Sequence, residues 1–197
     1  MFERLAAAGE GAFGGFAMLG DPDLETSAAL LDTLAAGGAD MIEVGIPFSD
    51  PVADGPVIQA AAKRALEAGV RVADCFDLIS GFRERHGDIP IGMLTYANLV
   101  VARGREHFFA RAAQAGADSL LVADLPAREA EPWSKGMREV GLEPVLIAAT
   151  NTPPDTLRTI ARLGSGYTYC VTRVGVTGAG ARPQFDSALV GRLRAAG

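Results

Sequence analysis

Strand-like and helix-like patterns alternate along the sequence, and this alternation limits the possible folds more than any other feature. It is clearest at Gly38-Ala39-Asp40 and Gly116-Ala117-Asp118, which each follow a helical pattern and precede a short apolar run. A repeated order of helix end, Ala-Asp pair and buried strand is typical of a chain built from copies of one βα unit. Such units predict a parallel sheet covered by helices.

Apolar periodicity and the positions of glycine predict where the individual elements lie. The helix that begins at Leu24 ends at Gly37-Gly38, and Asp74 is the predicted N-cap of a later helix. The predicted strands are 12–19, 38–44, 89–95, 116–122, 143–149 and 166–172, and the predicted helices are 2–8, 24–36, 57–68, 74–86, 104–115, 129–140, 155–163 and 187–195.

Two sheet architectures fit this order, an open doubly wound sheet and a closed barrel. The dinucleotide-binding form of the open sheet needs a G-x-G-x-x-G turn after the first strand, and Gly11 to Gly20 lacks that spacing. Polar residues instead follow the second, third, fourth and sixth strands, where a (β/α)8 barrel has its active site. The sequence therefore predicts the α/β class and a TIM (β/α)8-type barrel, with six βα units in a single domain over residues 1–197.

A stiff acidic loop follows the second predicted strand. Its prolines fix φ and remove backbone donors, so Glu43 to Pro56 begins as a strand and then continues as neither helix nor sheet. Residues alternate faces along a strand, so Ile42 and Val44 are predicted to pack against helices while Glu43 projects into the interior. Burial there raises the pKa of a carboxyl group toward the range useful for proton transfer.

Glu43 and Asp54 each have a structural alternative, a buried salt bridge for Glu43 and a turn before Gly55 for Asp54. Because one rigid loop joins them, we expect a catalytic pair. On the sixth predicted strand, Tyr167 and Tyr169 share a face, and both core packing and a hydroxyl in the site fit Tyr169.

The glycine-rich loop from Arg173 to Arg182 has the composition of a mobile lid, and a plain flexible connection is the alternative. Its glycines act as hinges, while Arg173 supplies a cation and Thr177 a hydroxyl. Backbone N–H groups around Gly178 are suited to receive a phosphate, because glycine lets an anion approach the chain closely.

Charge and hydropathy exclude several classes of protein. The formal net charge is −6 and no basic run occurs, which argues against a nucleic-acid or anionic-membrane partner. The N-terminus lacks the apolar region of an export signal, and the charge-free stretch from Ile89 to Ala102 is too short to span a bilayer. We therefore expect a soluble, cytoplasmic protein.

Metal and disulfide chemistry is not expected either. Cys75 and Cys170 are far apart and lack metal-binding spacing, so both are predicted to be free, buried thiols. His86 and His107 have no ligand-like neighbours at helical spacing and are predicted to be solvated surface residues.

The stretch from Glu43 to Gln59 resembles the signature of the tryptophan synthase alpha subunit family, the indole-glycerol-phosphate lyases. Similar segments follow the family's order elsewhere, at 13–22, 90–100, 121–124 and 166–178. The resemblance implies cleavage of indole-3-glycerol phosphate to indole and glyceraldehyde 3-phosphate, in tryptophan biosynthesis, without a metal or an organic cofactor. It also implies a beta-subunit partner in an alpha2beta2 heterotetramer.

The resemblance implies roles position by position. Glu43 and Asp54 match the catalytic carboxylates, so Glu43 would shuttle protons and Asp54 would stabilise positive charge on the indole nitrogen. The other implied positions are Phe16 and Leu121 in the indole pocket, Tyr169 beside Glu43, Arg173 and Thr177 in a closing lid, Gly178 as a backbone contact to phosphate, and Pro47, Asp50, Tyr96 and Asn98 near or at the beta-subunit surface.

Two rival functions stay open at this point, a non-catalytic barrel that docks on and regulates a beta subunit, and another phosphate-sugar barrel enzyme. The family's remaining phosphate contacts come from loops after strands seven and eight, which are absent from these 197 residues. Six parallel strands also leave two unpaired edges. We therefore expect the natural protein to continue with two more βα units.

Overall fold

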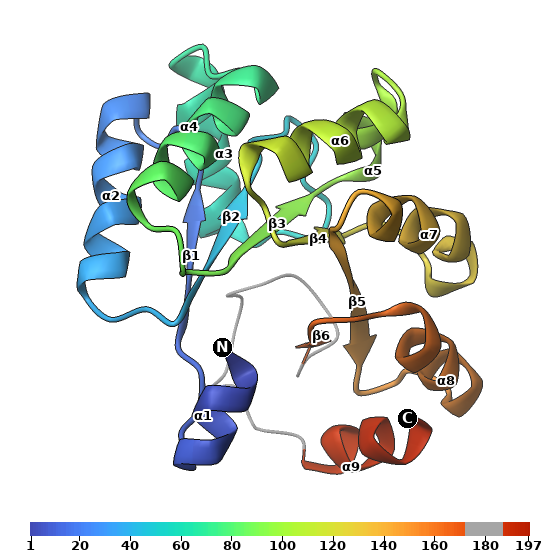
Figure 1. Cartoon of the computed structure of the whole chain (residues 1–197). Helices are drawn as coiled ribbons and strands as arrows, with labels where there is room; N and C mark the ends of the chain where they lie inside the picture. The colour runs from blue at the N-terminus through green and yellow to red at the C-terminus, as the bar shows by residue number, and fades with distance from the viewer. Residues whose placement is uncertain (172–186) are drawn as a thin grey trace.

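The computed structural model describes residues 1–171 and 187–197, and it shows a curled parallel sheet with helices along its outer side (Figure 1). The six strands pair in chain order from β1 to β6, and every pairing is parallel. Within the described residues, β1 and β6 are therefore the two edges. This arrangement confirms the predicted six βα units of a TIM-type barrel. The predicted lid, with Arg173, Thr177 and Gly178, lies outside the described residues.

The elements follow the predicted order closely. The strands are β1 (Gly14–Met18), β2 (Met41–Gly45), β3 (Ile91–Thr95), β4 (Ser119–Val122), β5 (Glu143–Ala149) and β6 (Thr168–Val171). The helices are α1 (Phe2–Ala8), α2 (Leu24–Ala36), α3 (Pro56–Glu67), α4 (Val72–Arg85), α5 (Ala97–Val101), α6 (Arg105–Ala115), the 3-10 turn η1 (Ala127–Glu129), α7 (Glu131–Glu139), α8 (Pro154–Leu163) and α9 (Ser187–Ala196).

Some predicted helix boundaries are wrong, each for a local reason. Asp74 is not the N-cap of α4, because the helix begins two residues earlier and Arg71 occupies the cap position. The Asp74 carboxylate instead accepts the Arg71 backbone N–H at 2.8 Å, as an acidic third residue does in a capping box. Helix α5 was not predicted, because five residues are too few to show a helical period. The helix predicted at 129–140 is divided into η1 and α7.

The hydrophobic core lies between the outer face of the sheet and the surrounding helices. Ile42 and Val44 of β2 are 0% and 1% exposed and belong to this core, as do Ile91 and Met93 of β3. The alternation predicted for β2 is thereby confirmed. Because one set of residues packs under the helices, the alternate set faces the interior of the curled sheet.

The repeated Ala-Asp pair has a structural role at the beginning of two strands. Asp40, just before β2, accepts the Phe13 N–H at 3.0 Å, and Asp118, just before β4, accepts the Ile91 N–H at 2.7 Å. Each aspartate also donates its own N–H to the carbonyl of the same residue, at 2.8 Å in both cases. These two-way contacts fix the register of a strand against its neighbour, which explains why the motif occurs twice.

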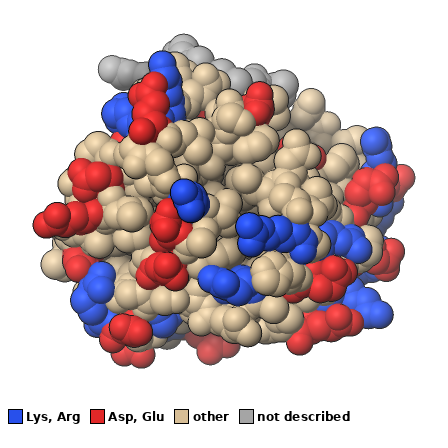
Figure 2. Space-filling model, turned by 90° about the horizontal axis from the view of Figure 1, so that it is seen from above, with Lys and Arg blue, Asp and Glu red and all other residues tan. Residues whose placement is uncertain are grey.

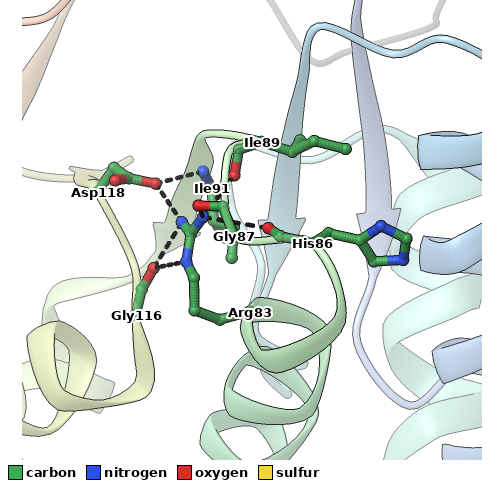
Figure 3. Close-up of polar contacts among 7 residues, drawn as sticks. All are labelled: Arg83, His86, Gly87, Ile89, Ile91, Gly116 and Asp118. Carbon is green, nitrogen blue, oxygen red and sulfur yellow. Dashed lines mark hydrogen bonds and ion pairs between the residues drawn. The ribbon is translucent and has the colours of Figure 1, made fainter.

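Arg83 at the end of α4 joins this scheme and connects three parts of the chain (Figure 3). Its guanidinium donates to the Gly116 carbonyl at 2.8 and 3.0 Å and pairs with Asp118 at 2.5 Å. It also donates to the carbonyls of Gly87 and Ile89, at 2.8 and 2.9 Å. Gly116 has φ +94°, and a Cβ there would lie 2.7 Å from Cγ of Arg83. Both the backbone angle and the lack of space therefore require glycine at this position.

We expect Arg83→Met to destabilise the protein by about 2–4 kcal/mol, because several partly buried carbonyl groups lose their donor at once. Chemical unfolding in urea measures this change. Arg85→Met is the matched control, since Arg85 pairs with Asp32 at the surface and such pairs contribute about 0–1 kcal/mol. Equal losses in the two variants would contradict the role given to Arg83.

The cysteines and histidines match the predictions only in part. Both cysteines are free, but Cys75 is buried while Cys170 is exposed, so the prediction of burial is wrong for Cys170. His107 is exposed as predicted. His86 is not simply solvated, because its ring packs on Phe82 and its Nε2 lies 2.9 Å from Asp32.

Charged side chains of both signs are interspersed over the face shown in Figure 2, and neither sign covers it. No helix in the described ranges combines the length and the apolar character that crossing a membrane requires.

Candidate active site

Inward-facing side chains near the carboxyl ends of the strands line a recess of about 380 Å³. Its position matches the active-site end of a (β/α)8 barrel. Two acidic groups lie among otherwise mainly apolar side chains. The lining residues are Phe16, Glu43, Ala53, Asp54, Ile58, Leu94, Leu121, Ala123, Ile147, Tyr169 and Val171.

Strand register and the loop after β2 together bring five residues that the sequence singled out to one recess. Phe16 of β1 lies opposite Glu43 of β2, so the ring and the carboxyl group are neighbours on the inner face. Leu121 and Tyr169 reach the same recess from β4 and β6, and Asp54 reaches it from the loop after β2. The structure thus places both predicted carboxylates beside the predicted pocket residues.

Two glycines on the inner face make room for these aromatic groups. A Cβ at Gly45 would lie 2.7 Å from the tip of the Phe16 ring, and a Cβ at Gly92 would lie 3.0 Å from the Tyr167 hydroxyl. Contacts this short force a neighbour to move. The aromatic side chains therefore occupy space that only glycine leaves open.

Glu43 lies partly buried without a cationic partner among the described residues, so the salt-bridge alternative is not observed there. Tyr167 donates a hydrogen bond to Glu43 Oε1 at 3.2 Å. Burial raises the pKa of Glu43, while the Tyr167 hydrogen bond opposes that shift by stabilising the ionised form. The raised pKa agrees with the prediction made from strand alternation.

Asp54 is buried, with 9% of its surface exposed, at the end of the proline-containing loop. Burial raises its pKa, and the Tyr96 hydroxyl, which donates to Oδ2 at 3.0 Å, limits that rise. The same hydroxyl accepts the Ala53 N–H at 3.2 Å, and the Gln59 side chain donates to the Asp54 carbonyl at 2.8 Å. Hydrogen bonds therefore fix the Asp54 carboxylate, its own carbonyl group and the N–H of the preceding residue, Ala53.

Sequence analysis singled out Tyr96 and Tyr167 but did not predict that they contact the carboxylates. Tyr96, which the resemblance places near or at the beta-subunit surface, is only 1% exposed, and its proximity to a partner stays a prediction. Its ring stacks on Phe48 with centroids 5.2 Å apart while its hydroxyl bonds to Asp54, and both contacts draw it inward. Tyr167 and Tyr169 are two residues apart, so they share one face of the strand. This spacing was the only sequence signal that Tyr167 faces the site.

Tyr169 lies close to both acidic groups. Burial raises the pKa of its hydroxyl first, and the negative charges of Glu43 and Asp54 raise it further. Of the residues expected near a partner surface, Pro47 is buried, whereas Asp50 and Asn98 are exposed.

Among the residues at 1–171 and 187–197, no group of three or more His, Cys, Asp or Glu side chains is arranged to hold a metal ion.

Comparison with known proteins identifies the family of this arrangement. The family model described as tryptophan synthase alpha chain matches residues 2–196. The chain belongs to the tryptophan synthase alpha chain family. A relative from Photobacterium profundum is 50% identical over 179 residues, covering 91% of this chain and 66% of the relative. One from Yersinia pseudotuberculosis is 49% identical over 195 residues, covering 98% of this chain and 73% of the relative.

Solved structures of tryptophan synthase have the same fold. A structure of Mycobacterium tuberculosis tryptophan synthase matches with a TM-score of 0.91 and 33% identity, covering 100% of this chain and 75% of that chain. The tryptophan synthase complex from Pyrococcus furiosus matches with a TM-score of 0.78 and 38% identity, covering 81% of this chain and 66% of that chain. The chain thus spans about two thirds of the length of several alpha chains it matches.

We expect Tyr167→Phe to raise the pKa of Glu43 further above its ordinary value. The tyrosine hydrogen bond favours the charged carboxylate, so its loss leaves burial unopposed and moves the titration to higher pH. NMR titration of the Glu43 side-chain carbon measures this directly. Tyr169→Phe is the matched control, since no hydrogen bond from Tyr169 to Glu43 is described. An unchanged or lowered pKa in the Tyr167 variant would contradict this assignment.

Proposed function

We propose that this recess is the cleavage site of a carbon–carbon lyase, which converts indole-3-glycerol phosphate to indole and glyceraldehyde 3-phosphate in tryptophan biosynthesis. The observation that carries the proposal is the pair Glu43 and Asp54, two carboxyl groups with raised pKa on one apolar recess, each held by a tyrosine hydroxyl. Membership of the tryptophan synthase alpha chain family supports it.

The reaction needs a proton at C3 of the indole ring before the bond to the side chain can break. Protonated Glu43 donates that proton, and positive charge develops at the ring nitrogen. Asp54, ionised and hydrogen-bonded to the ring N–H, stabilises this charge as it forms. A buried carboxylate is effective here because water does not screen it.

Bond cleavage then restores both the ring and the catalyst. Glu43, now ionised, accepts the proton of the hydroxyl on the carbon attached to C3, and the C3–carbon bond breaks. Its electron pair returns to the ring, which leaves as neutral indole, while the hydroxyl-bearing carbon becomes the aldehyde. Glu43 thus gives one proton and takes one, for which a carboxyl pKa above its ordinary value is suited.

The apolar walls suit the flat indole ring. Phe16, Leu121 and Ile147 surround the two carboxyl groups in the recess. We propose that Tyr169 contacts the substrate beside Glu43. The roles of Arg173 and Thr177 in a lid, and of Gly178 in holding phosphate, stay predictions, as their segment lies outside the described residues.

The non-catalytic alternative, a barrel that only docks on a beta subunit, is not favoured. Docking requires surface residues, and it gives no reason for two carboxyl groups to be desolvated in an interior recess. Because Glu43 lacks a cationic partner in the described part of the chain, a purely structural ion pair does not explain its burial either.

We propose a beta subunit as partner, in an alpha2beta2 assembly like the tryptophan synthase a2b2 complex of Pyrococcus furiosus. The loop that carries Asp54 presents Asp50, Val52 and, at the start of α3, Val57, with both valines 74% exposed. Asn98 on α5 is exposed as well. Exposed apolar side chains rimmed by polar ones are typical of an interaction surface.

Hydrogen–deuterium exchange at C3 of indole tests the proton transfer without needing a phosphate group. In D2O, we expect the protein to accelerate this exchange above buffer, and Glu43→Gln to reduce the acceleration by about 10²-fold or more, since the acid–base group is lost. NMR of the indole C3 proton gives the rate, and thermal unfolding verifies that the variant is folded. Release of indole from indole-3-glycerol phosphate, with and without a beta subunit, tests the complete reaction.

Asp54→Asn separates the two roles. In the Asp54→Asn variant, the rate of exchange at C3 of indole should also fall below that of the unaltered protein, while the pH dependence due to Glu43 is retained. If Glu43→Gln exchanges as fast as the unaltered protein, Glu43 is not the proton carrier. Disappearance of the pH dependence in the Asp54 variant would instead mean that the two roles are reversed.

We expect Val52→Asp to weaken association with a tryptophan synthase beta subunit by about tenfold or more, because it places a charge on an apolar contact. Analytical ultracentrifugation or titration calorimetry measures the affinity. Leu30→Asp on α2 is the matched control, as it also introduces aspartate at an exposed apolar side chain (41% exposed). Equal affinity of the two variants would exclude this loop from the interface.

A further inference from the structure

A second recess, also about 380 Å³, lies on the outer side of the barrel between the beginning of α4, helix α5 and the first half of α6. Its floor includes Val100 and the rings of Phe76 and Phe108, which pack edge to face with centroids 5.4 Å apart. It shares no lining residue with the recess around Glu43 and Asp54. It is therefore a separate feature of the molecule.

The rim of this outer recess carries Arg71, Arg103 and Arg111, with His107 nearby. Most other arginines in the described ranges pair with a carboxylate or a backbone carbonyl, but no such contact is described for these three guanidinium groups. The acidic residues closest to them in sequence are Asp74, whose carboxylate accepts the Arg71 backbone N–H at 2.8 Å, and Glu106, which pairs with Arg105 at 3.8 Å. Three guanidinium groups without an acidic partner among residues 1–171 and 187–197 thus gather in a protein whose net charge is −6.

One of the arginines is already held in place. The Arg111 guanidinium lies 5.4 Å from the centroid of the Phe76 ring, within the range of a cation–π contact. Such stacking orients the planar fork of an arginine while leaving its N–H groups free to bind. The outer recess therefore combines an apolar floor with an oriented donor group.

We infer that the outer recess binds a small aromatic carboxylate. Guanidinium groups match the two oxygens of a carboxylate with parallel hydrogen bonds, and the phenylalanine floor fits a flat ring. The volume lies within the range of small-molecule sites. This site is independent of the proposed lyase reaction.

Titration of the 197-residue chain with benzoate, followed by NMR of backbone amides, tests this site. We expect saturable shifts at Val72, Val100 and Phe108, and little change at Leu121 in the inner recess. Benzamide keeps the ring but loses the charge, and inorganic phosphate keeps charge but lacks the ring. Both should bind at least about tenfold more weakly than benzoate, because benzamide loses the ion pair with the arginines and phosphate loses the contact with the phenylalanine rings.

Arginine variants decide which cations are responsible. Arg103→Gln and Arg111→Gln should each weaken benzoate binding by about tenfold. Arg194→Gln removes the same charge from α9 and should leave binding unchanged. Circular dichroism verifies folding of each variant. Equal affinity in all three variants, phosphate binding as tight as benzoate, or shifts centred on Leu121 would each overturn the proposal.

Discussion

The inner face of this sheet depends on one constraint, which is that neighbouring parallel strands keep a fixed register. A shift by one residue would turn Glu43 toward the helices and Ile42 toward the interior. Asp40 and Asp118 oppose such a shift, since each exchanges hydrogen bonds with a residue at the beginning of the adjacent strand. Arg83 reinforces the second of these ties by bonding to Asp118 and to Gly116 just before it.

Because the register holds, Glu43 and Asp54 can be buried in one recess without a cationic partner from residues 1–171 or 187–197. Burial disfavours their ionised forms, and the hydroxyls of Tyr167 and Tyr96 reduce that penalty without abolishing it. An arginine in place of either tyrosine would stabilise the ionised carboxylate far more strongly and lower its pKa. Neutral donors thus leave Glu43 able to hold and release a proton, as the proposed reaction requires.

The two recesses differ in the sign of their charge, although both have apolar walls. The inner recess carries Glu43 and Asp54 and suits a neutral ring on which positive charge develops. Arginines surround the outer recess, which suits a ring with a permanent negative charge. Since long-range fields are screened over about 8–10 Å at physiological salt, each recess selects its ligand mainly through its own lining residues.

Local patterns in the sequence were sufficient for much of this protein. Alternating apolar periods predicted six parallel βα units, and the fifth strand was predicted with the bounds observed, Glu143–Ala149. The inward direction of Glu43 followed from the buried pair Ile42 and Val44, because strand geometry alone alternates faces. Such features depend on neighbours within a few residues, so they can be read without a structure.

Contacts between distant segments were decided only in the tertiary structure. Tyr96 is 42 residues from Asp54, and Tyr167 is 124 residues from Glu43, so no local pattern could pair them. The burial of Tyr96 likewise depends on Phe48 from another loop. The sequence by itself determined which strands carry acidic and aromatic residues and which way they point. Only the curvature and register of the assembled sheet decided which of these side chains meet, because those properties arise from all the strands packed together.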